Sequence, residues 1–121
     1  MIDQQKRADV FSDFLDFCIK SLEIEEIPSI KFTDDTGWCR DYCTFGMFIP
    51  DNKEIMVYIK NRNLADICRT LAHELVHKRQ HEIGTLTSQS GETGSEIENE
   101  ANEVAGVIMR SYGQKNPEIY E

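Results

Sequence analysis

Apolar side chains recur every three or four residues in three stretches of the chain, which is the period of an amphipathic helix. The spacing predicts helices over residues 3–23, 61–83 and 95–112. Asn61 or Asn63 can cap the start of the second helix, because a short polar side chain accepts hydrogen bonds from the first free backbone amides.

Three short runs between the first two helices have the composition of β-strands: residues 29–32, 43–49 and 54–59. Residues 33–37 carry turn chemistry, and a Pro-Asp-Asn-Lys sequence predicts a tight hairpin turn before the third run. The third run is almost entirely apolar or β-prone, which favours a strand that is covered on both faces or that binds a segment along its edge.

These elements predict an α+β fold. An N-terminal helix precedes a small three-stranded, mainly antiparallel sheet, and two further helices follow it. A chain of 121 residues is expected to form a single domain over residues 1–121. The last helix is expected to stop at Gly113, which leaves residues 113–121 as a candidate flexible tail.

The second helix is expected to turn its histidines away from the core. At 100° per residue, one apolar stripe consists of Leu64, Ile67, Cys68, Leu71 and Leu75. His73 and His77 fall on nearly the opposite side, beside Thr70 and His81. A histidine that only fills a core should lie among apolar neighbours, so this phase favours a functional site.

His73 and His77 belong to a His-Glu-x-x-His sequence. Two histidines four residues apart on a helix are about 6 Å apart along its axis, close enough to bind one zinc ion. Glu74 is turned about 100° away, which suits a general base acting on a zinc-bound water better than a metal ligand.

Composition narrows the functional classes. The formal net charge is −9 and no basic run occurs, so nucleic acid is not expected as the main ligand. The polar N-terminus lacks the apolar segment of a signal peptide, and no apolar run is long enough to cross a membrane. A cytoplasmic location is the expectation.

The four cysteines are expected to be reduced in that compartment. Cys39 and Cys43 are four residues apart and no second pair follows. A second metal site at these two residues is therefore disfavoured against a simple packing role.

Two histidines leave a catalytic zinc site incomplete, because such sites usually have three protein ligands. His81 lies about 12 Å from His73 along the helix, which is too far for one ion. The chain has three histidines in all, so an acidic ligand is required. Candidates on the last helix are Glu96, Glu98, Glu100 and Glu103.

The two motifs together resemble the gluzincin metallopeptidases, in which a second helix carries Glu-x-x-(Ala/Ser)-(Asp/Asn). The resemblance implies Glu98 as the third zinc ligand, with Glu100 as the second choice. It also implies that Ala101 allows the helices to approach and that Asn102 braces the first histidine. Asn102 stands where the broader clan commonly has Asp.

The order of elements over residues 40–112 is most similar to minimal gluzincins and to ImmA/IrrE-type peptidases. This resemblance implies a zinc metalloendopeptidase that binds one Zn²⁺ ion and acts on a protein or peptide substrate. We expect the peptide to lie antiparallel along residues 55–59. Candidate donors to the oxyanion are Tyr42, Tyr58 and Tyr112.

Two other functions remain open. A zinc-stabilised fold of this type could bind or regulate a partner without turnover, although such a protein has no need of Glu74. Alternatively, the enzyme could be latent, with residues 116–121 blocking the zinc. The polar segment 84–94 joins the two metal-binding helices, and it either borders the substrate or serves only as a connector.

Overall fold

The computed structural model describes residues 3–85 and 96–121 and confirms the α+β class. In chain order the elements are α1 (Gln4–Ser21), β1 (Ser29–Thr33), α2 (Thr36–Tyr42), β2 (Gly46–Ile49), the 3₁₀ helix η1 (Pro50–Asn52), β3 (Glu54–Tyr58), α3 (Leu64–Glu82), α4 (Glu96–Lys115) and the 3₁₀ helix η2 (Pro117–Tyr120). None of the helices within the described ranges has the length and apolar character needed to span a bilayer.

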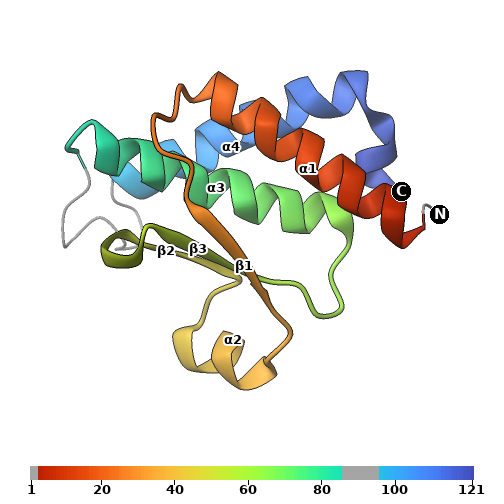
Figure 1. Ribbon diagram of the computed structural model, residues 1–121, viewed down its shortest axis with the longest axis horizontal. Coiled ribbons are helices and arrows are strands. Elements are labelled where there is room, and N and C mark those ends of the chain that lie inside the picture. Colours follow the sequence, from red (N-terminus) through yellow and green to blue (C-terminus); the bar gives the residue numbers. More distant parts are fainter. Residues whose placement is uncertain (1–2, 86–95) are drawn as a thin grey trace.

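Helix α3 is the central element of the molecule. One side of it contacts β2 and β3, and it also packs against α1 and α4 (Figure 1). The α3–α4 pair forms the most extensive contact in the described structure. Residues of α3 can therefore meet both the sheet and the last helix.

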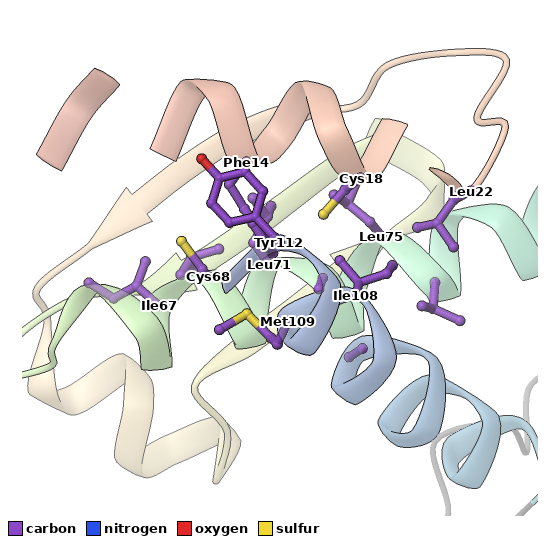
Figure 2. Packing of buried hydrophobic residues seen from close by; sticks show 14 of the residues in the cluster. Phe14, Cys18, Leu22, Ile67, Cys68, Leu71, Leu75, Ile108, Met109 and Tyr112 are labelled. Carbon is purple, nitrogen blue, oxygen red and sulfur yellow. The ribbon is translucent and has the colours of Figure 1, made fainter. Parts of the chain in front are cut away.

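The core lies where α1, α3 and α4 converge, and Figure 2 shows side chains from all three helices packed together there. The predicted apolar stripe of α3 is buried throughout: Leu64, Ile67, Cys68, Leu71 and Leu75. Phe14 from α1 meets the ring of Tyr112 from α4 edge-on, with ring centroids 5.1 Å apart. The helical phase derived from the sequence is thus confirmed.

The ends of α3 follow local sequence signals. The Asn63 side chain accepts a hydrogen bond from the Asp66 amide at 2.9 Å, so Asn63 rather than Asn61 is the cap. At the other end Gly84 has φ +83°, a left-handed conformation that glycine adopts without steric cost.

The sheet is mixed, with strand order β1-β3-β2, so the expectation of a mainly antiparallel sheet needs correction. β2 pairs antiparallel with β3 after the turn at η1, whereas β1 pairs parallel with β3. A parallel pair needs a long crossover connection, and the chain between β1 and β3 contains α2 and β2.

The prediction that a peptide lies along residues 55–59 was wrong, because β1 pairs with the edge of β3 that the peptide would need. β3 is the middle strand, and both of its edges are already hydrogen-bonded to neighbours. A peptide therefore cannot add along residues 55–59. Within the described ranges, β2 is bonded to a strand on one side only, and it is the edge strand that contacts α3.

A short helix, α2, covers residues 36–42, which lie between the predicted turn and the strand predicted over residues 43–49 and for which the sequence predicted no helix. Asp35 caps it by accepting hydrogen bonds from the amides of Gly37 and Trp38. This cap explains why the turn-forming residues before it start a helix. Residue Cys43 then adopts a left-handed conformation with φ 53°, and β2 begins at Gly46.

The C-terminal residues are folded onto the core rather than forming a loose tail. α4 continues past Gly113 to Lys115, and η2 places Ile119 in a fully buried position. A Cβ on Gly113 would lie 2.6 Å from the Tyr120 ring, so glycine at 113 permits this packing instead of ending the helix. These contacts lie toward the end of α4 that is far from Glu98.

Candidate metal and catalytic site

Helix α3 carries an unusual run of buried polar side chains. Among the described residues, the buried polar and charged ones are Glu74, His77, Lys78 and Gln80. Burying a polar group costs free energy unless the group has a hydrogen-bonding or charged partner. The partners of these four side chains therefore indicate why they are buried. Lys78 forms an ion pair with Glu82 at 3.4 Å, and the other three belong to one site.

His73, His77 and Glu98 converge between α3 and α4. The Nε2 atoms of the two histidines are 3.2 Å apart. Glu98 Oε1 lies 2.7 Å from His73 Nε2, and Glu98 Oε2 lies 3.2 Å from His77 Nε2. Among the described residues, these three form the group of side chains that could hold a metal ion.

The spacing of these atoms suits zinc. Ligands about 2.0–2.2 Å from a tetrahedral zinc ion are themselves about 3.3–3.6 Å apart. The three observed separations run from 2.7 to 3.2 Å, so small side-chain movements would admit an ion. Two imidazoles and one carboxylate also match the donor set of catalytic zinc sites, with a fourth position left for water or substrate.

Neighbouring residues on α4 have different contacts. Glu100 Oε1 accepts a hydrogen bond from Gln80 at 2.8 Å, whereas Glu98 meets both histidines. The geometry therefore favours Glu98 over Glu100 as the third ligand. The Asn102 side chain hydrogen-bonds to His73, the position that the resemblance implied for a brace.

Burial and charge set the protonation of the site. Burial lowers the pKa of His73, and this effect outweighs the nearby Glu98 carboxylate, so the ring favours the neutral form that binds metals. Burial, followed by repulsion from Glu98, raises the pKa of Glu74 to about 8. Glu74 Oε2 lies 4.0 Å from His73 Nε2, beside the cluster but outside it.

Strand β2 approaches α3 closely at Glu74. A Cβ on Gly46 would stand 2.4 Å from Thr70 Cγ2 and 3.2 Å from Glu74 Cγ. The Phe48 backbone amide also hydrogen-bonds to the Glu74 carboxylate. The edge strand thus lies directly against the candidate base.

A pocket of about 290 Å³ opens beside the cluster, with His73 and Glu74 in its lining. Arg62 forms part of the wall and is held by several contacts. Its guanidinium donates to the Tyr58 carbonyl at 2.8 Å and to the Thr70 hydroxyl at 2.7 Å, and it lies over the Phe45 ring. The pocket therefore combines one residue of the cluster, His73, with the candidate base and a fixed cation.

Several residues of the sequence-based site are placed elsewhere. The His81 ring contacts Phe48, with centroids 5.7 Å apart, and His81 is not part of the cluster. Of the candidate oxyanion donors, Tyr112 donates to Asp13 at 2.7 Å and Tyr58 hydrogen-bonds to Thr36. Tyr42 is largely exposed and packs on Trp38.

Three residues of the site were missed by sequence reasoning: Gln80, Gly46 and Arg62, the last of which had no signal in the sequence. Gln80 is fully buried and hydrogen-bonds to His77, and its signal was its position three residues after His77 on the same helix face. Gly46 had the weaker signal of a glycine inside a strand pattern, which marks close approach of another segment.

All four cysteines are free, and Cys18 and Cys68 are buried.

The chain was compared with protein-family models, curated proteins and solved structures. No family model matches it, and no curated protein and no solved structure is detectably similar to it.

Proposed function

We propose that the protein is a zinc-dependent metallopeptidase that hydrolyses a peptide bond in a protein or peptide substrate. The observation that carries the proposal is the convergence of His73, His77 and Glu98 from two helices, with the buried Glu74 at its edge. One zinc ion is the proposed cofactor. When bound, it would polarise a carbonyl group and lower the pKa of a water molecule.

Glu74 is proposed as the general base. Its carboxylate would take a proton from the attacking water and later deliver it to the leaving amine. A nearby cation favours the charged form of a carboxylate, so metal loading would offset the burial that raises the pKa of Glu74. The Phe48 amide hydrogen-bonds to the carboxylate and holds it beside the cluster.

The substrate would add to the outer edge of β2, where it would displace the contacts of Thr44 with the Gly46 backbone and of Glu74 with the Phe48 amide. This edge lies against Glu74, and an extended peptide can hydrogen-bond to a strand edge through its backbone. The adjoining pocket would take a side chain of that peptide. Of the possible oxyanion donors, the three tyrosines gain no support from their contacts.

Glu74 also bears on the rival functions. A module that only binds a partner has no use for a buried carboxylate beside the metal ligands, which costs stability. The latent form gains no support either, because η2 contacts α1, α3 and the late turns of α4. A cytoplasmic location is part of the proposal, in keeping with the four free cysteines.

The test compares zinc-loaded wild type with Glu74→Gln on a library of peptides whose cleavage products are read by mass spectrometry. We expect both proteins to bind one zinc ion and only the wild type to cut. Equal cleavage by both would remove Glu74 as the base. Zinc binding by both, with no cleavage by either, would favour the binding module.

A further inference from the structure

Gln80 connects the two helices of the site through one buried side-chain amide. Its Nε2 donates to the Ile97 carbonyl at 3.1 Å and to Glu100 Oε1 at 2.8 Å. Its Oε1 lies 2.8 Å from His77 Nδ1. With no exposed surface, Gln80 has no water to replace a lost partner.

These contacts determine which way the amide faces. A backbone carbonyl and a carboxylate oxygen only accept hydrogen bonds. The two N–H groups of the amide must therefore donate to the Ile97 carbonyl and to the Glu100 carboxylate. The amide oxygen is therefore the atom that faces His77. Because that oxygen can only accept, His77 Nδ1 must carry the proton.

The protonated Nδ1 has a consequence for the other ring nitrogen. In a neutral imidazole the second nitrogen bears a lone pair instead of a proton. His77 Nε2 lies 3.2 Å from Glu98 Oε2 and 3.2 Å from His73 Nε2, so the lone pair is presented to the candidate metal position. Such outer hydrogen bonds fix the tautomer of a metal-binding histidine.

The same amide also controls the second helix. Ile97 and Glu100 flank Glu98 in the first turn of α4, and both are bonded to Gln80. Holding the start of α4 against α3 sets the position from which Glu98 reaches both histidines.

We propose that Gln80 is the positioning residue of the metal centre, which sets the tautomer of His77 and docks the turn that carries Glu98. This inference rests on the proposed metal site. It adds that the site is organised before any metal arrives, and that one side chain serves ligands on both helices.

Substitutions at positions 80 and 100 separate the two tasks. Gln80→Glu keeps an acceptor for His77 but removes both donors to α4 and places two carboxylates together. The double variant Gln80→Glu/Glu100→Gln reverses the polarity of that contact, since the new amide at position 100 can donate to the new carboxylate at position 80. Glu100→Gln alone is the control, because its amide oxygen still accepts from Gln80.

The readout is zinc affinity measured by competition with a chromogenic chelator. We expect Gln80→Glu to lose about 10–100-fold in affinity, as removal of outer partners typically does. The double variant should recover part of the loss, because the Ile97 carbonyl stays without its donor, and Glu100→Gln should stay within about threefold of wild type. Melting curves of the zinc-free proteins verify folding. Near-wild-type affinity of Gln80→Glu, or a double variant no better than the single one, overturns the proposal.

Long-range ¹H–¹⁵N correlation spectra of zinc-free wild type at pH 9 give an independent readout that needs neither zinc nor activity. We expect the His77 proton on Nδ1. A proton on Nε2 overturns the inference whatever the variants do. If wild type binds no zinc but His77 carries its proton on Nδ1, the proposed function fails while the role of Gln80 in orienting His77 stands.

Discussion

Gly46 of β2 lies against Glu74 of α3, and this close approach of strand and helix depends on position 46 having no side chain. A Cβ there would stand 3.2 Å from Glu74 Cγ and 3.4 Å from its Oε2. Together with the hydrogen bond from the Phe48 amide, this contact joins β2, the proposed substrate edge, to the proposed base.

Gly46→Ala should therefore harm both stability and catalysis. The added Cβ would meet Thr70 Cγ2 at 2.4 Å, so β2 or α3 must shift. Overpacking of this kind costs about 1–3 kcal/mol in the free energy of unfolding. We expect a loss in this range by urea denaturation, with weaker peptide cleavage at unchanged zinc content.

Gly106→Ala is the matched control for that prediction. Nothing lies within 4 Å of a Cβ at Gly106, which is inside α4. Alanine is the better helix former by about 1 kcal/mol, so this variant should be slightly more stable than wild type. If Gly46→Ala behaved like Gly106→Ala, the close approach of β2 to α3 would be refuted.

Zinc should stabilise the protein through Glu98. At a zinc concentration of about 100 times Kd, binding adds about 2.7 kcal/mol to the free energy of unfolding. We expect Glu98→Gln to raise Kd at least about 100-fold, which at the same zinc concentration leaves about 0.4 kcal/mol. Thermal unfolding with and without zinc measures the difference.

Glu100→Gln is the control here as well, because Glu100 contacts Gln80 and not the histidines. It should keep most of the zinc-induced shift in Tm. A reversed result, with Glu100→Gln losing the shift and Glu98→Gln keeping it, would assign the third ligand to Glu100.

A second carboxylate ties the end of α3 to the loop after α1 and should give the stability a pH dependence. Partial burial of Glu82 opposes its charge, but hydrogen bonds from the Glu26 and Glu25 amides and the Lys78 ammonium outweigh it and hold the pKa of Glu82 below 4.5. A lowered pKa contributes stability above pH 4.5, and this contribution is lost as the pH falls through the folded-state pKa.

Glu82→Gln should thus cost up to about 1 kcal/mol in unfolding free energy at pH 7, because solvent screens a charged acceptor whose hydrogen bonds lie at the exposed surface. The difference from wild type should shrink as the pH falls below 4.5 and through the folded-state pKa of Glu82, and vanish once Glu82 is protonated in both folded and unfolded chains. Glu23→Gln, at an exposed ion pair with Arg79, should show neither effect. A cost that did not vary with pH would exclude this explanation.

Much of the fold follows from local signals. The phase of α3, its Asn63 cap and the separation of its Leu face from its histidines depend on residues close in sequence. The parallel pairing of β1 with β3 could not be predicted, because it joins segments more than 20 residues apart and depends on the whole core. α2 was not predicted, because a short polar residue such as Asp35 suits a turn as well as the cap of a helix.

The candidate site could likewise be predicted only in part from the sequence. His73, Glu74 and His77 form a motif, and their spacing alone implies a shared ion. The choice between Glu98 and Glu100 depended on the rotation of α4 against α3, which the sequence left open. Gln80 has a meaning only once its three partners from two helices are known.

The zinc X-ray absorption spectrum of protein loaded with one equivalent of zinc tests the central claim most directly. The account predicts a shell of nitrogen and oxygen neighbours at about 2.0–2.1 Å, with the outer-shell scattering of two imidazole rings. A sulfur shell at about 2.3 Å would place the metal on cysteine instead. That result, or a shell without imidazole, would contradict a zinc centre formed by His73, His77 and Glu98.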